Sequence, residues 1–217
     1  MLEQPKYLYY MLNCCELIAA IVALMYFKNF KNSYWKWFAY YLFYIVFYDV
    51  IIGRLALGFY LSSKLDAYFA FVQIPIEFLF FIWLFALKSL NNKKLFWVCI
   101  SVYLLSLIPD SSLSKGDYYF SSFNYIIGAL LLLVLVILEF NKQIKSETIL
   151  QFKEDKMFYI NIGVVLFYIG TLPFFGLYYP IMKVPEIWNN YYIYFMISNC
   201  IMYLLFASSF IWGKVKL

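Results

Sequence analysis

The 217-residue sequence predicts an all-α fold, a polytopic membrane bundle of seven transmembrane helices. Hydrophobic residues make up 65% of the chain and charged residues only 13%, with a mean hydropathy of +0.76. A soluble domain would carry about 25% charged residues, so one water-soluble core has no room for this much apolar surface. Seven apolar segments reach or approach the length of about 20 residues that a helix needs to cross a bilayer.

The predicted spans belong to a single membrane domain, residues 1–217, and most end close to tyrosine or tryptophan. They cover residues 7–27, 37–60, 67–87, 95–108, 120–140, 157–179 and 191–212. These rings prefer the head-group level of a bilayer, so they indicate interfacial belts. The fourth span is short, with 14 apolar residues before Pro109, and residues 109–117 predict an irregular turn. Pro75 and Pro173 predict kinks in the third and sixth spans.

The distribution of lysines predicts the orientation of the chain. With seven spans, one side of the membrane holds 12 of the 17 basic residues: Lys28, Lys31, Lys36, Lys88, Lys93, Lys94, Lys142, Lys145, Lys153, Lys156, Lys214 and Lys216. Without the fourth span, the last six of these would move to the opposite side and the bias would vanish. Because cytoplasmic loops carry the excess of basic residues, we expect the N-terminus outside and the C-terminus in the cytoplasm. We expect a multi-pass protein of the cytoplasmic (inner) membrane.

Three carboxyl groups, Glu16, Asp49 and Glu77, lie near the middle of the first three spans. Each belongs to a stripe of small or polar residues at helical spacing. The stripes are Asn13, Glu16, Ala20 and Ala23; Asp49, Gly53 and Ala56; and Ala70, Gln73 and Glu77. Small residues let helices approach closely, so we expect these stripes to face the inside of the bundle.

The carboxyl groups allow two interpretations. Ionised and unpaired, each would cost about 2.5–3.5 kcal/mol at the bilayer centre, so at least two should be protonated or paired with a cation. Arg54 is the intramembrane cation, but it lies about 140° around the helix from Asp49. One interpretation is a proton or cation site, or a ligand site, to which Asn13, Gln73 and Asn199 add polar groups. The other is a structural cluster of neutral carboxyl groups that hydrogen-bond neighbouring helices.

The composition excludes several kinds of chemistry, and we expect no enzyme activity. The chain has no histidine, which removes the usual general base, proton shuttle and imidazole metal ligand. Its cysteines, Cys14, Cys15, Cys99 and Cys200, lie inside apolar segments, where we expect them to act as small hydrophobic side chains. We therefore predict no catalytic residue, no cofactor and no metal site. The net charge of +5 comes from short loops and does not indicate nucleic-acid binding.

Two segments carry a resemblance to known sequences. Residues 158–176 (FYINIGVVLFYIGTLPFFG) and residues 190–212 resemble uncharacterised seven-span integral membrane proteins of Bacteroidota type. The heavy use of Phe, Tyr, Ile, Lys and Asn along the whole chain is similar as well. The resemblance implies a small membrane protein and no particular activity.

Two classes of function remain, of which we favour the first. It is a non-catalytic membrane protein, a receptor-like sensor or accessory component that acts through a partner in signalling or phage defence. A cytoplasmic protein or anionic lipid would bind the basic loops from Asn91 to Lys94 and from Asn141 to Lys156. The alternative is a small proton- or cation-coupled transporter or channel that uses the carboxyl cluster, with spans arranged like those of SWEET carriers. A transporter predicts a water-accessible path to Glu77 and Asp49, whereas an accessory protein predicts a dry bundle.

Overall fold

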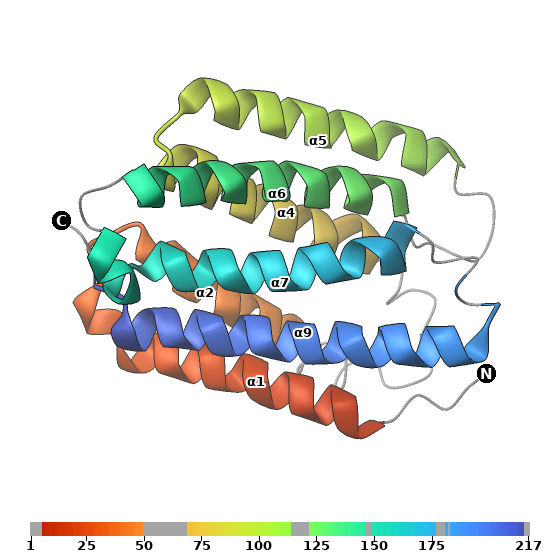
Figure 1. The fold of residues 1–217 in the computed structure, drawn as a ribbon, viewed down its shortest axis with the longest axis horizontal. Coiled ribbons are helices and arrows are strands. Elements are labelled where there is room, and N and C mark those ends of the chain that lie inside the picture. Colours follow the sequence, from red (N-terminus) through yellow and green to blue (C-terminus); the bar gives the residue numbers. More distant parts are fainter. Residues whose placement is uncertain are drawn as a thin grey trace. The chain divides into compact units, whose positions relative to one another are not determined.

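The computed structural model describes residues 6–49, 69–113, 122–145, 149–176, 181 and 183–214 (Figure 1). These described residues form helices and no strand, which confirms the predicted all-α fold. Five helices are long and apolar enough to cross a membrane: Tyr7–Met25, Phe71–Ser89, Phe123–Lys145, Lys156–Pro173 and Pro185–Trp212. They correspond to the first, third, fifth, sixth and seventh predicted spans. The length and composition of these helices are those of a polytopic membrane protein.

The second and fourth predicted spans correspond to α2 (Trp35–Val46) and α5 (Lys93–Leu113). Neither is among the five helices that meet the length and composition of a span. Residues 50–60 of the second predicted span lie outside the described residues. The total of seven spans and the orientation of the chain therefore stay predictions.

Helix α5 differs from the predicted fourth span at both ends. It begins at Lys93, because Asn91 adopts a left-handed φ of 51° and the Oδ1 atom of Asn92 accepts a backbone N–H of the first turn at 3.0 Å. At its other end the helix continues past Pro109, so the irregular turn predicted for residues 109–117 is wrong for residues 109–113. Proline removes one backbone donor from a helix, and the loss of that single hydrogen bond does not end α5.

The chain divides into two compact units. The terminal unit combines both ends of the chain, Met1–Ala56 and Gln143–Leu217, and the middle unit is formed by Leu57–Lys142. In the terminal unit, α9 (Pro185–Trp212) packs between α1 (Lys6–Met25) and α7 (Lys156–Gly176), and α2 packs against α1 (Figure 1). The single membrane domain predicted for residues 1–217 stays a prediction.

The core of the terminal unit is aromatic. Phe38 of α2 is fully buried, and its ring centroid lies 5.1 Å from that of Phe206 and 5.6 Å from that of Phe210, both on α9. Phe30, in the turn before α2, packs on Phe210 at 5.0 Å. Lipid is as apolar as these side chains, so they stabilise the unit through ring packing, at about 0.5–1.5 kcal/mol per pair, rather than by leaving water.

In the middle unit, the helix around Pro75 is irregular. Helix α4 (Ile74–Ile82) is flanked by two π-helical turns, Phe69–Gln73 and Trp83–Ser89. The first of these turns lies directly before Pro75, at which the sequence predicts a kink. A widened turn beside a proline accommodates its missing backbone donor, so the irregularity falls where it was expected.

Phe78 joins α4 to α5 and α6 (Ser122–Lys145). Its ring centroid lies 5.3 Å from that of Tyr103 on α5 and 5.4 Å from that of Tyr125 on α6. A Cβ atom at Gly128 of α6 would lie 2.7 Å from the Phe78 ring. The absence of a side chain at Gly128 is therefore what lets α6 come this close to α4.

We expect Gly128→Ala to lower the thermal unfolding temperature of the protein in detergent. The new methyl group would overlap a buried ring, and overpacking of this kind costs about 1–3 kcal/mol. Gly163→Ala is the matched control, because a Cβ atom there would lie 3.4 Å from its nearest neighbours on Met202. Equal unfolding temperatures for the two variants would contradict the close approach of α6 to Phe78.

Candidate functional site

The polar stripe of α1 faces the inside of the terminal unit. Asn13, Glu16, Ala20 and Ala23 are all buried, as the spacing predicts. The opposite face carries exposed apolar side chains: Tyr7, Met11, Ile18 and Met25. In a membrane this second face is the one that meets lipid, so the periodicity of the sequence assigns the two faces of α1 correctly.

Glu16 lies in a seam between α1 and α9 beside two thiol groups. Glu16 is only 2% exposed. Cys15 of α1 and Cys200 of α9 are side-chain neighbours, and the Glu16 carboxyl group is within electrostatic range of both. No periodicity connects residues at opposite ends of the sequence, so this pairing of Cys15 with Cys200 was not predicted. Cys15 and Cys200 are buried, as the sequence predicts, but the sequence does not predict that they lie next to each other.

Two other predicted site residues belong to the same unit. Asn199, next to Cys200 on α9, has a buried Oδ1 atom without a hydrogen-bond partner among the described residues. Asp49 is half-buried after the end of α2 and takes part in an interaction. Gly53, Ala56 and Arg54 lie outside the described residues, so the predicted stripe of the second span is not tested.

Gln73 and Glu77 belong to the middle unit. Gln73 ends the π-helical turn before α4, and Glu77 lies four residues later in α4. Gln73 is buried and Glu77 is half-buried. Both take part in interactions. Since these two residues and Glu16 are in different units, the meeting of all three carboxyl groups stays a prediction. Among the described residues, no group of three Cys, Asp or Glu side chains is placed to hold a metal ion.

Lys156 is a buried cation that the sequence analysis missed. It was counted with the loop lysines, yet it is only 3% exposed at the first residue of α7. Its Nζ atom lies 5.1 Å from the ring centroid of Phe210, 5.6 Å from that of Phe30 and 6.0 Å from that of Trp35. The ammonium group also donates to the Ser209 carbonyl oxygen at 3.0 Å. The negative end of the α9 dipole and three π faces thus stabilise the charge.

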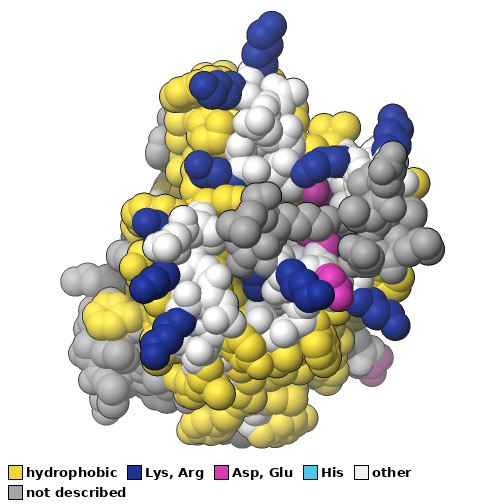
Figure 2. Space-filling model, turned by 90° about the vertical axis from the view of Figure 1, so that its left-hand side faces the viewer, with side chains coloured by type: hydrophobic (Ala, Val, Ile, Leu, Met, Phe, Trp, Pro, Cys, Tyr) yellow, Lys and Arg dark blue, Asp and Glu magenta, His cyan; other side chains and the backbone are white. Residues whose placement is uncertain are grey.

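Other lysines gather at one end of each unit. In the terminal unit this is the end at which α1 and α9 finish, and it carries the exposed side chains of Lys28, Lys31, Lys153 and Lys214. In the middle unit it is the end at which the π-helical turn Trp83–Ser89 leads to α5, with Lys88, Lys93, Lys94 and Lys142. Figure 2 shows dark-blue basic side chains on this side of the molecule. Two carboxylates are paired there, Glu154 with Lys214 at 2.7 Å and Glu139 with Lys142 at 3.5 Å. Each unit therefore has a strongly basic end.

Comparison with known proteins finds no matching family model, no matching curated protein and no matching solved structure. The resemblance of residues 158–176 and 190–212 to seven-span Bacteroidota-type proteins stays an expectation. The class that the fold defines is an all-α membrane protein, and any narrower function is argued from the residues alone.

We expect Cys15 and Cys200 to form a disulfide when the protein in membranes is treated with copper phenanthroline. Cys15 and Cys200 are side-chain neighbours across the two helices, so we expect oxidation to join them. Intact mass and peptide mapping would detect the bridge between α1 and α9. Cys14→Ser is the matched control, since residue 14 points about 100° away on the helix and should leave the yield unchanged. A bridge that survives Cys15→Ser or is lost with Cys14→Ser would contradict the described seam.

We expect Lys156→Ala to destabilise the protein by about 2–4 kcal/mol. The change removes a packed aliphatic stem, and it also removes the cation that contacts three rings and the Ser209 carbonyl oxygen. Unfolding in detergent, followed by circular dichroism, would measure the loss. Lys153→Ala serves as control, because Lys153 is exposed and such substitutions change stability by about 0.5 kcal/mol or less. Similar losses for both variants would show that Lys156 is not held as described.

Proposed function

We propose that the protein is a non-catalytic, multi-pass protein of the cytoplasmic membrane that acts through a partner, as a receptor-like sensor or an accessory component. The observation that carries this proposal is the burial of Glu16. A carboxyl group that is 2% exposed, on the buried face of α1 and within electrostatic range of Cys200 on α9, suits helix packing better than proton movement. Half-buried Asp49 and Glu77 have partners as well.

The basic ends of the two units support an orientation with the N-terminus outside and the C-terminus in the cytoplasm. Basic side chains concentrate on the cytoplasmic side of membrane proteins. Asn91 and Asn92 before α5, and Lys93 and Lys94 in its first turn, are all exposed, and so is Lys142 near the end of α6. A partner with an acidic surface would find three lysines of the middle unit there, of which only Lys142 lies within ion-pair distance of a carboxylate among the described residues.

A second candidate is a proton- or cation-coupled transporter or channel. It is favoured by buried amide groups in the terminal unit that lack partners among the described residues: both amide atoms of Asn161 on α7, and Oδ1 of Asn199 on α9. An unpaired amide in an apolar bundle costs roughly 2–7 kcal/mol, and a hydrated path would supply the missing hydrogen bonds.

Proton flux into proteoliposomes separates the two candidates. We expect the wild-type protein and the triple variant Glu16→Gln, Asp49→Asn, Glu77→Gln to show the same background flux under a pH gradient and a membrane potential. The amide side chains should preserve the fold, because they have nearly the same size and shape as the carboxyl groups that they replace. Flux in the wild type that vanishes in a folded triple variant would overturn the proposal and establish a conduit.

A photo-crosslinking residue at position 93 would test the partner in the host membrane. We expect a discrete adduct from position 93 that disappears when Lys94 is changed to Glu, and none from position 183. Equal labelling at positions 93 and 183, or an adduct that persists with Lys94→Glu, would contradict a partner held by the basic loop.

A further inference from the structure

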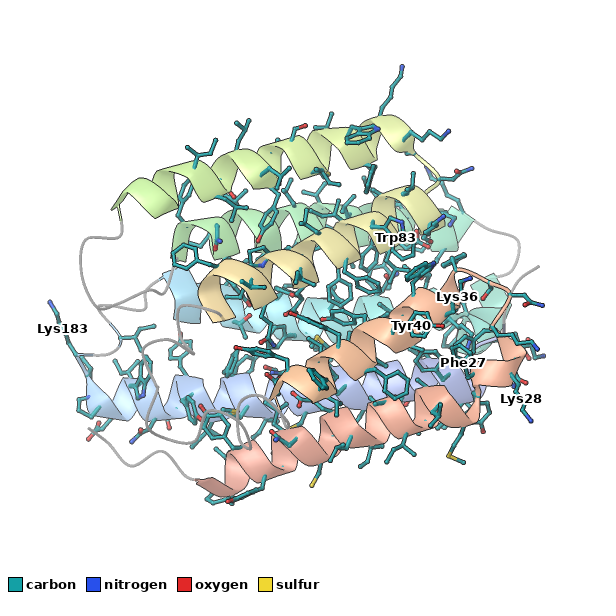
Figure 3. The ribbon with its side chains drawn as sticks, turned by 180° about the vertical axis from the view of Figure 1, so that it is seen from behind. Phe27, Lys28, Lys36, Tyr40, Trp83 and Lys183 are labelled. Atoms are coloured by element: carbon teal, nitrogen blue, oxygen red, sulfur yellow. The ribbon has the colours of Figure 1, made fainter. Side chains whose placement is uncertain are left out.

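The turn between α1 and α2 forms a corner in which exposed rings stand beside lysines. The chain leaves α1 at Met25, makes a short 3-10 turn, Phe27–Asn29, and begins α2 at Trp35. The ring centroid of Phe27 lies 6.0 Å from that of Tyr40, which lies 5.7 Å from that of Trp37. We call Phe27, Tyr40 and Trp37 the ring row. Figure 3 shows Phe27 and Tyr40 at this corner, with Lys28 and Lys36 at the same end of the unit.

The corner is held in place by buried contacts on its inner side. Phe30 is buried against Phe210, and the Oγ atom of Ser33 donates to the Phe30 carbonyl oxygen at 2.8 Å. The same Oγ atom accepts the backbone N–H of Trp35 at 3.3 Å, at the start of α2. The ring row therefore stands on a fixed turn, and a ligand that binds there meets an already ordered surface.

The ring row continues into an apolar outer face. Trp37 is 52% exposed and Tyr40 48%, and Phe47 further along the chain is 51% exposed. The side of α2 that carries Phe38, Leu42 and Ile45 is buried, so the two faces alternate with helical spacing. In a membrane helix, an outer face of exposed rings lies against acyl chains, and its first turn lies at the head-group level.

The charge at the corner is positive, and no ion pair among the described residues neutralises it. Lys28 and Lys31 are exposed, and the Nζ atom of Lys36 lies 5.8 Å from the ring centroid of Trp37. The sequence from Leu17 to Tyr48 contains no Asp or Glu. The acidic residues before α7 are engaged elsewhere: Glu154 pairs with Lys214, and Asp155 accepts the backbone N–H of Met157 at 3.0 Å.

We infer that this corner is a binding site for one anionic glycerophospholipid, with its phosphate held by Lys28 and Lys36 and an acyl chain lying along the ring row. Lys28, Lys31 and Lys36, which form no ion pair among the described residues, complement an anionic head group. A soluble acidic partner would use the lysines and leave the rings exposed, whereas a lipid uses both. This site differs from the loops assigned to a protein partner and does not rest on the proposed function.

Retention of lipid by the purified protein tests the site. The protein would be reconstituted with equal amounts of phosphatidylglycerol and phosphatidylcholine, extracted in mild detergent and analysed by native mass spectrometry. We expect wild-type protein to retain phosphatidylglycerol preferentially. The double variant Lys28→Gln, Lys36→Gln should reduce this preference about tenfold, whereas Lys28→Arg, Lys36→Arg, which keeps both charges, should preserve it. Lys183→Gln is the matched control, an exposed lysine at the opposite end of the same unit (Figure 3).

Fluorescence quenching locates the bound lipid. The fluorescence of Trp37 is the emission that the wild type shows and Trp37→Phe lacks. Phosphatidylglycerol with brominated acyl chains should quench this emission more strongly than brominated phosphatidylcholine does. The inference is overturned by equal retention of the two lipids by the wild type, or by a loss with Lys183→Gln as large as with the double variant. Quenching that is the same in wild type and Trp37→Phe would also overturn it. Size-exclusion chromatography and circular dichroism confirm that each variant is folded.

Discussion

The packing of α9 is the constraint on which the terminal unit depends. Helix α9 contacts α1 and α7 along its length and meets α2 through the rings of Phe206 and Phe210. On the buried face of α9, away from water, a polar side chain is stabilised by a partner nearby. Ser198 and Ser209 find such partners within the helix, because their hydroxyl groups donate to the carbonyl oxygens of Phe195 and Phe206 at 3.0 and 2.7 Å. Thr171 on α7 follows the same rule, with Phe167 as its acceptor at 2.8 Å.

The same constraint explains which parts of the site the sequence predicts. A stripe such as Asn13, Glu16, Ala20 and Ala23 is a property of one helix, and helical periodicity alone assigns it to the buried face. Lys156 is a different case, since a lysine next to an apolar segment is normally exposed, and only the rings from three other parts of the chain show that this one is not. Such contacts depend on tertiary packing, which composition and spacing along one helix do not encode.

Local signals also compete at helix ends, and their relative strength decides the outcome. At the start of α5, the cap by Asn92 extends the helix two residues before the predicted apolar run. At its end, Pro109 predicts a stop, but α5 continues to Leu113. Proline removes a single backbone donor, and that loss alone does not end the helix.

Lysine ammonium groups lie near aromatic rings both at the basic ends, where the lysines are at least partly exposed, and at Lys156, which is buried. Lys36 lies 5.8 Å from the Trp37 ring in the terminal unit, and Lys88 lies 5.4 Å from the Trp83 ring in the middle unit. In both pairs the ammonium group lies within cation–π distance of the ring, and the lysine side chain is at least partly exposed. Lys156 is surrounded on several sides by rings and bonded to the Ser209 carbonyl oxygen. Its charge is consequently used to hold the end of α9, and it is not available to a lipid or a partner. A count of lysines thus overestimates the surface charge of a membrane protein wherever a helix end and several rings meet one ammonium group.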